Sequence, residues 1–397
     1  MLKKKRMSVK IPDDIAALIC TASFFVMDYT IAGKGVGFIT YVFCILALLI
    51  SVCKGKKLII RRLKEKTLFT VMTISCISAQ IGNYIIRNHN STLITSAAVC
   101  IIIWGILLVL PDLIGFESFY KYFKLACILV SFVIIIQFIL IYVFHQDISR
   151  IYLLPEKWAF ASDESITHAR PISIFPEPSF YGNFAGMMVL LSCYKKERYI
   201  SIYFLFTAVL STSLTGICIC MFFIVFDWYS RRKKSIKNID VRKWLVAAIL
   251  LLVLFFVYQC FASGGLDFAR YGRSFYIRVI SGYRAMKMFD WKDLLFGIGY
   301  GNMHFFVNPG VSNYLSGIFT IIINYGIINM LIFLMFCMDF FLRCKKMQYT
   351  RMAIAGILVL MIGQAMFYNT SFLIWIFIIY IVRKDESQIM NCQGVNL

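Results

Sequence analysis

The chain has 397 residues, of which 60% are hydrophobic, and its mean hydropathy is +0.77. Soluble domains are about half apolar, so this composition excludes an ordinary soluble protein and indicates a membrane protein. The formal net charge of +21 would suggest a nucleic-acid partner in a soluble chain. Here most lysines and arginines lie in short clusters between apolar runs, as in cytoplasmic loops of membrane proteins. We therefore expect no nucleic acid.

Apolar runs of roughly membrane-spanning length recur along the whole sequence. They predict transmembrane helices, since about 20 apolar residues cross the hydrocarbon core of a bilayer. We expect an all-α integral membrane protein, a single polytopic domain over residues 1–397 with about twelve transmembrane helices. The predicted spans are 15–32, 36–53, 67–86, 93–110, 123–144, 179–194, 199–211, 214–229, 244–262, 314–342, 352–368 and 371–382.

Basic clusters set the predicted orientation of these spans. The N-terminal MLKKKRMSVK is basic and no cleavage site closes the first apolar run, so we expect an uncleaved first helix that starts in the cytoplasm. Five further clusters then fall on the same side, which holds 30 of the 41 basic residues: 54–66, 195–198, 231–243, 343–346 and 383–384. The positive-inside rule therefore places both termini in the cytoplasm.

Residues 199–229 are long enough for one helix, yet basic clusters flank both ends. A single crossing would place one of these clusters outside. We instead expect two crossings that break at Ser211–Gly216 (STSLTG), which keeps the count at twelve rather than eleven. Each half is short, so the break is expected inside the membrane, against protein or a water-filled cavity.

The first long outer segment, residues 145–178, leads into RPISIFPEPSFYGNFAG, which opens a hydrophobic helix. Two prolines fix the backbone on either side of Glu177, and Arg170 lies seven residues before it. Charged groups at a membrane boundary are costly and often functional. Glu177 and Arg170 are therefore candidate catalytic residues, with an interfacial salt bridge as the alternative. The small residues that follow predict close helix packing.

The second long outer segment, residues 263–313, carries a net charge of about +3, against the positive-inside trend. Its cations are mostly arginines, which suit bidentate recognition of phosphate. The alternative is an amphipathic helix on anionic lipid headgroups. Both outer segments are expected to carry short interfacial helices. The candidate diphosphate-binding residues are Arg270, Arg273, Arg278 and Arg284, and His304 and His168 are candidate acid–base groups.

Other polar features are expected to be structural. The thirteen cysteines fall mostly in apolar runs, which favours packing thiols over disulfides. There is no CxxC and the four histidines are scattered, so we expect no metal and no cofactor. Five polar residues within predicted spans are expected to make packing hydrogen bonds rather than an ion path: Asp28, Gln80, Asn83, Gln137 and Asp339. Gly297–Gly301 is expected to form a turn into the membrane.

Four short motifs follow one another along the chain. They are R-P-x-S-x-F-x-E-P-S at Arg170–Ser179, STSLTG at Ser211–Gly216, LFGIGYG at Leu295–Gly301, and Asn313-Tyr314-Leu315 followed by Asn324-Tyr325-Gly326-Ile327. In their residues and their order they resemble the motifs of the O-antigen polymerase and O-antigen ligase superfamily of bacterial membrane glycosyltransferases. The resemblance covers residues 150–340, and it implies that Pro178, Asn313 and Tyr314 are motif-positioning residues.

The resemblance implies a metal-independent glycosyltransferase of the bacterial cytoplasmic membrane that makes O-antigen, capsule or exopolysaccharide. Its substrate would be polyprenyl (undecaprenyl) diphosphate-linked oligosaccharide on the outer face. Glu177 would act as the base, and arginines would stabilise the leaving diphosphate. The implied partners are this lipid-linked glycan, membrane lipid, and the chain-length regulator and flippase of the same pathway.

Two departures favour a polymerase over a ligase. Ser312 stands where ligases commonly have histidine, and Leu214 stands where they often have a basic residue. A glycan ligase remains the alternative. A transporter of lipid-linked glycan would show internal repeats and mid-membrane ionisable residues, which we do not find. An inert scaffold of an envelope complex would not require the arginine-rich segment.

Overall fold

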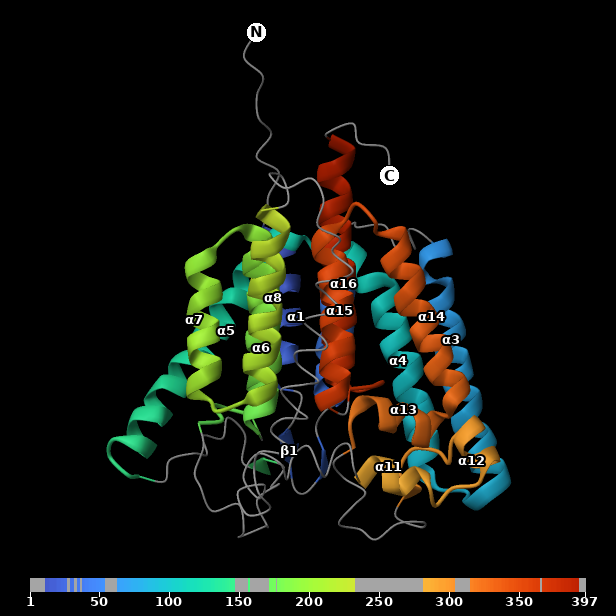
Figure 1. Ribbon diagram of the computed structural model, residues 1–397. Coiled ribbons are helices and arrows are strands. Elements are labelled where there is room, and N and C mark those ends of the chain that lie inside the picture. Colours follow the sequence, from blue (N-terminus) through green and yellow to red (C-terminus); the bar gives the residue numbers. More distant parts are fainter. Residues whose placement is uncertain are drawn as a thin grey trace.

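The apolar stretches of the sequence form helices that stand side by side and alternate in direction (Figure 1). The computed structural model describes residues 11–26, 29–31, 34–35, 38–53, 63–146, 156–157, 171–175, 177–232, 281–303, 315–364 and 366–392. The predicted span at 244–262 lies outside these residues.

Most helices follow the predicted apolar runs, but the predicted span 15–32 is wrong in its second half, because α1 ends at Phe24 and residues 29–31 form a strand. In the first part of the chain they are α1 (Ile11–Phe24), α2 (Phe38–Cys53), α3 (Leu63–Asn83) with a π-helical turn η1 (Tyr84–Asn88), α4 (Ser91–Leu113) and α5 (Phe116–Tyr142). Then come α6 (Pro178–Lys195), α7 (Arg198–Leu210), α8 (Leu214–Arg232), α11 (Ser281–Met286), α12 (Trp291–Phe296), α13 (Gly317–Tyr325), α14 (Ile327–Arg343), α15 (Gln348–Gly363) and α16 (Thr370–Cys392).

Within the described part of the chain, four stretches of helix are long and apolar enough to cross a membrane. They are Lys66–Arg87, Ser91–Leu113, Phe116–Tyr142 and Leu214–Arg231, with 18 to 27 residues each. A helix rises about 1.5 Å per residue, so these lengths match the hydrocarbon core of a bilayer. Shorter apolar helices pack among them, which indicates a membrane-embedded helical protein.

A small antiparallel sheet was not predicted. It has the order β2 (Lys34–Gly35), β1 (Tyr29–Ile31) and β3 (Glu156–Lys157). Thr30 of β1 is paired with Glu156, so the connection between α1 and α2 meets the first long outer segment. The sheet is too short to leave a periodic pattern in the sequence.

The predicted span 314–342 is wrong as a single helix, because the chain breaks at Gly326 between α13 and α14. Gly326 has a φ of 93°, which favours glycine. A Cβ atom there would lie 2.6 Å from the carbonyl carbon of Phe296. The chain therefore turns where another backbone passes directly against it.

The predicted break within 199–229 is confirmed. α7 ends at Leu210 and α8 begins at Leu214, with Thr212 between them at a φ of 56°. The two helices run in opposite directions side by side (Figure 1). As a result, Arg231 at the end of α8 returns to the C-terminal end of α6, where it donates to the Cys193 carbonyl at 3.0 Å.

Two helices form the centre of the bundle. Every residue from Tyr181 to Cys193 of α6 is buried, as is every residue from Ser371 to Arg383 of α16. A Cβ atom on Gly216 of α8 would lie 2.6 Å from the Cα atom of Gly182 of α6. Small residues allow this approach, as in close helix pairs of membranes. The predicted close packing of α6 is confirmed.

Basic side chains gather at one end of the bundle, the upper end in Figure 1, named the basic end. It carries the α6–α7 connection with Lys195 and Lys196, the α14–α15 connection, and the last turns of α16. Lys384 of α16 donates there to the carbonyl oxygens of Pro111, Asp112 and Ile114 at 3.2, 2.7 and 3.1 Å. A lysine on unsatisfied carbonyls at a helix C-terminus is favourable.

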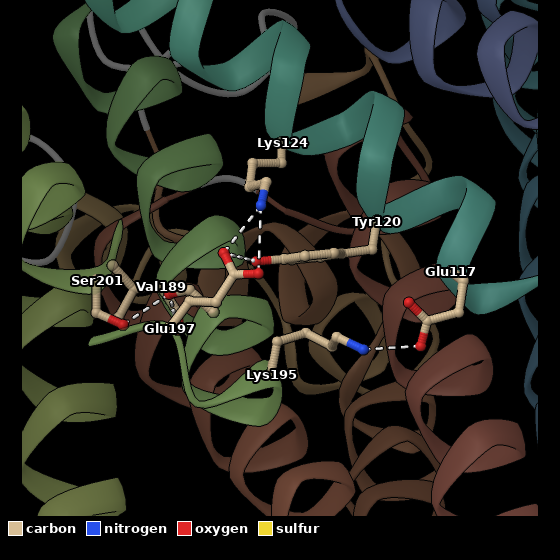
Figure 2. Close-up of polar contacts among 8 residues, drawn as sticks. Glu117, Tyr120, Lys124, Val189, Lys195, Glu197 and Ser201 are labelled. Carbon is tan, nitrogen blue, oxygen red and sulfur yellow. Dashed lines mark hydrogen bonds and ion pairs between the residues drawn. The ribbon is translucent and has the colours of Figure 1, made fainter. Parts of the chain in front are cut away.

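Figure 2 shows a polar cluster at the basic end that joins α5 to the α6–α7 connection. The Glu197 carboxylate accepts from the Tyr120 hydroxyl at 2.8 Å and from the Lys124 ammonium at 2.9 Å. Lys195 pairs with Glu117 at 2.7 Å. Burial alone raises the pKa of Glu197, but the hydrogen bonds from Lys124 and Tyr120 outweigh it, and the pKa is lowered.

The contact between Gly216 and Gly182 predicts a size limit. Gly216→Ala should destabilise the protein by about 1–3 kcal/mol through overpacking. Gly105→Ala in α4 is the matched control, because no atom lies within 4 Å of its added methyl group. Thermal unfolding of both purified variants in one detergent tests this. Equal midpoints for the two variants would contradict the close approach.

The lowered pKa of Glu197 predicts a pH dependence. Its contribution to stability is present above the ordinary glutamate pKa of about 4.3 and is lost as the pH falls through the lower folded value. Glu197→Gln should therefore lower the thermal midpoint at pH 7, and the difference from wild type should shrink below about pH 4. Glu117→Gln, which removes a more exposed partner, should change little at either pH. A difference that is unchanged by acid would refute the ion-pair role.

Candidate functional site

The structure describes three of the predicted site residues. Glu177 and Pro178 lie at the start of α6, and Arg284 lies exposed on α11. The other predicted site residues, both candidate histidines among them, lie outside the described part of the chain. They are Arg170, His168, Arg270, Arg273, Arg278, His304, Asn313 and Tyr314. The candidate site is therefore built around Glu177.

Glu177 directly precedes α6 in an extended conformation, with φ −143° and ψ 154°. Pro178 is the first residue of the helix, a position where its fixed φ and missing N–H are harmless. The Ser179 hydroxyl donates to Oε2 of Glu177 at 2.9 Å, which orients the partly exposed carboxylate. α6 begins at the end of the bundle opposite the basic end, named the loop end, where α11 and α12 also lie (Figure 1).

A buried glutamine of α5 fixes the segment before Glu177. Oε1 of Gln137 accepts from the backbone N–H groups of Ile172 and Ser173 at 3.0 and 2.6 Å. Ser173 has a φ of 55°, so the chain turns sharply there. The turn places Phe175 in the core, where its ring stacks on Phe184 of α6 with centroids 4.9 Å apart. The expectation that Gln137 makes a packing hydrogen bond is confirmed.

Two further amide side chains, Gln364 and Asn183, bond to each other beside the first turns of α6. Nε2 of Gln364, at the end of α15, donates to the Ser179 carbonyl at 2.8 Å. Oε1 of Gln364 accepts from Nδ2 of Asn183, one helical turn further along α6. Sequence reasoning missed both amides. The one signal for Gln364 was a polar amide within the predicted span 352–368, the same signal that singled out Gln137.

The glycine motif of the second outer segment packs onto the bundle. Ile298 and Gly299 donate from their backbone N–H groups to the carbonyls of Ile323 and Asn324, at 2.8 and 3.1 Å. Gly297 has a φ of 78°, and a Cβ atom there would lie 2.6 Å from the carbonyl carbon of Tyr325. The motif therefore lies against the end of α13, as expected for a turn into the membrane rather than a phosphate loop.

Two polar residues of α3 hold this glycine turn. Asn83 donates to the Gly297 carbonyl at 3.1 Å. Gln80 accepts from the Tyr300 N–H at 2.9 Å and donates to the Asn324 carbonyl at 3.2 Å. Both residues are buried and make packing hydrogen bonds, as predicted. Asp339 instead forms an ion pair with Arg343 in the last turns of α14, and Asp28 lies outside the described residues.

A continuous set of contacts joins Glu177 to α11. The Gln364 carbonyl lies 2.8 Å from where a Cβ atom on Gly317 of α13 would be. On α13, the Phe319 ring lies 2.6 Å from where a Cβ atom on Gly282 of α11 would be. The helix that follows Glu177 and the helix that carries Arg284 are thus joined at the loop end through the end of α15 and α13.

This arrangement combines a fixed, partly exposed carboxylate with helix ends that favour anions. α6, α8 and α13 all begin at the loop end. Helix N-termini carry partial positive charge and unsatisfied N–H groups, which favour phosphate and carboxylate ligands. A carboxylate can accept a proton from a hydroxyl group, and an exposed arginine can bind a phosphate. The loop end therefore offers the groups needed for transfer chemistry on an anionic substrate.

The two hydrogen bonds that Gln137 accepts should protect the backbone amides of residues 172 and 173 from hydrogen exchange. Gln137→Leu removes the acceptor for two buried N–H groups, at a cost of about 1–3 kcal/mol each, or roughly 5- to 150-fold faster amide exchange. Hydrogen exchange of residues 171–175, followed by mass spectrometry, measures this. Gln146→Leu, an exposed change four residues beyond the end of α5, should leave the exchange unchanged. Equal exchange in both variants would show that Gln137 does not protect these amides.

Comparisons with known proteins identify no relative. No protein-family model matches this chain, and no curated protein matches it. The four sequence motifs and the geometry of the loop end are therefore the observations on which a functional proposal rests.

Proposed function

We propose that this protein polymerises oligosaccharide repeat units, carried on a polyprenyl diphosphate, into a surface polysaccharide. The reaction takes place on the outer face of a bacterial cytoplasmic membrane. The observation that carries this proposal is the position of Glu177, whose carboxylate is held at the first turn of α6 on the loop end. The resemblance of residues 170–179 to the polymerase motif supports it.

In the proposed reaction, Glu177 accepts the proton of a sugar hydroxyl on one lipid-linked glycan. The hydroxyl oxygen bonds to the anomeric carbon of the second glycan as the bond from that carbon to the diphosphate breaks. Polyprenyl diphosphate leaves with the bonding electrons, and cationic side chains stabilise its developing charge. The proposed diphosphate ligands are Arg270, Arg273, Arg278 and Arg284, and Arg170, seven residues before the base in the sequence, is a further proposed catalytic residue.

The proposed topology has twelve spans with both termini in the cytoplasm. The basic end then faces the cytoplasm and the loop end faces outward, as the positive-inside rule requires. α8 ends at the basic end whereas α11 lies at the loop end (Figure 1). A crossing at 244–262 accounts for this change of side.

Replacement of Glu177 tests the catalytic proposal. Glu177→Gln keeps the shape of the side chain but removes proton acceptance, so polymerisation should fall by about 100- to 10,000-fold. Glu177→Asp should recover little, because its carboxylate is one methylene short. Glu117→Gln, at the basic end, is the matched control and should leave activity unchanged. The measurement is glycan chain length on a gel, at equal protein levels.

The same gel distinguishes a polymerase from a ligase. When activity is lost, a collapse from a ladder to a single repeat unit identifies a polymerase, whereas a ladder that persists without its final anchor identifies a ligase. A normal ladder from Glu177→Gln would remove Glu177 from the role of base.

Replacement of Arg284 tests the proposed binding of the diphosphate. Arg284→Lys should lower the rate by about 30- to 1000-fold, or roughly 2–4 kcal/mol, because bidentate binding is lost. Lys287→Arg, on the same short segment, is its control.

A further inference from the structure

Gln364 occupies the junction between the two outer segments. It ends α15, and only 8% of its surface is exposed. Its side chain bonds to Ser179 and Asn183 of α6, while its backbone carbonyl lies against Gly317, the first residue of α13. One residue therefore contacts both the helix that follows the first outer segment and the helix that follows the second.

The two bonds of the Gln364 side chain fix the first turn of α6. Ser179 and Asn183 are four residues apart, so they lie one above the other on the same helix face. A single amide that donates to the Ser179 carbonyl and accepts from the Asn183 side chain holds this face of α6 in one orientation about the helix axis. The Ser179 hydroxyl in turn donates to Glu177 at 2.9 Å. Glu177 therefore bonds to the side chain of the same serine whose backbone carbonyl accepts from Gln364, two residues further along the chain.

The amide pair is costly as a purely structural element. Among the residues that the structure describes, Oδ1 of Asn183 is buried without a hydrogen-bond partner. Burial of such an atom costs free energy, and apolar side chains of the same shape would avoid this cost. Costly local arrangements of this kind are characteristic of functional sites. The pair therefore calls for a role beyond helix packing.

We propose that Gln364 is a positioning residue for Glu177, acting through Ser179, and that it ties this position to α13. The inference rests on the proposed function, in which Glu177 is the base. Loss of the bond to Ser179 would let the first turn of α6 rotate and move the carboxylate away from the acceptor hydroxyl. A displacement of this kind lowers the rate of the chemical step without weakening substrate binding.

Two substitutions separate the two bonds of Gln364. Gln364→Met preserves length and removes both bonds, whereas Gln364→Glu, in its ionised form, keeps the acceptor for Asn183 and removes the donor to the Ser179 carbonyl. Both should lower kcat of the full-length protein in lipid nanodiscs by about 10- to 100-fold, with KM for the lipid-linked glycan unchanged. Gln348→Met, at the other end of α15, is the matched control and should behave as wild type.

A double variant distinguishes positioning from a general loss of packing. In the Glu177→Gln background, Gln364→Met should cause little further loss, because residues that act as a unit are not additive. Independent, multiplied losses would overturn the proposal. Wild-type activity of Gln364→Met would also overturn it, because methionine cannot donate to the Ser179 carbonyl and the bond would then be dispensable.

A measurement without substrate keeps this inference separate from the proposed function. Labelling of Glu177 by a water-soluble carbodiimide, followed by mass spectrometry, reports the environment of its carboxylate. Gln364→Met should change the labelling rate at least threefold, whereas Gln348→Met should not change it. Absence of polymerisation by the wild type would refute the proposed function alone. Equal labelling rates in the two variants would refute positioning by Gln364, whatever reaction the protein catalyses.

Discussion

A chain inside a bilayer must satisfy its own backbone hydrogen bonds, because hydrocarbon offers no partner for an N–H or C=O group. This constraint shapes the loop end, where several segments leave the helical pattern. Amide side chains from neighbouring helices supply the missing partners there. Gln137 serves the segment before α6, Gln80 and Asn83 serve the glycine turn, and Gln364 bonds to the first turn of α6. Amides therefore bond both to the segment that leads to Glu177 and to the first turn of the helix that follows it.

The two ends of the bundle are held by different chemistry. At the basic end, ammonium groups bind carbonyls and carboxylates, as Lys384 and Lys195 do. At the loop end most of the described cross-links are neutral amides, with the pair of Arg87 and Asp293 as an ionic exception. A neutral amide adds no net charge and keeps its donors and acceptors at any ordinary pH. The local electrostatic field is therefore set by the charged side chains near these amides.

Sequence reasoning located the features that depend on local pattern. The apolar runs gave helices, the flanking charges gave the break between α7 and α8, and isolated polar residues gave Gln80, Asn83 and Gln137 as packing groups. Sequence reasoning failed where a structural feature depends on a segment that is distant in the sequence. The break at Gly326 arises because the backbone of 295–297 passes against it, which no property of residues 314–342 reveals.

The candidate site shows the same division. Pro178 and the extended Glu177 follow from the local sequence, since proline fixes the start of a helix. The contact of Gln364 with Ser179 joins residues 185 positions apart, so its partner cannot be read from either sequence window. Sequence alone identifies the amide as unusual within an apolar run, and only the packing of α15 on α6 assigns its partner.

The burial of α16 has a consequence for the order of assembly. This helix packs against rings of earlier helices, as in the pairs of Phe377 with Phe24, Trp375 with Phe223 and Tyr380 with Phe340. Each of those partners precedes α16 in the chain and leaves the ribosome before it. The place that α16 fills must therefore stay open, or be occupied by lipid, until residues 370–392 have been synthesised. The bundle closes only after all of these partners have been made, and a chain that stalls before residue 370 would lack this buried helix.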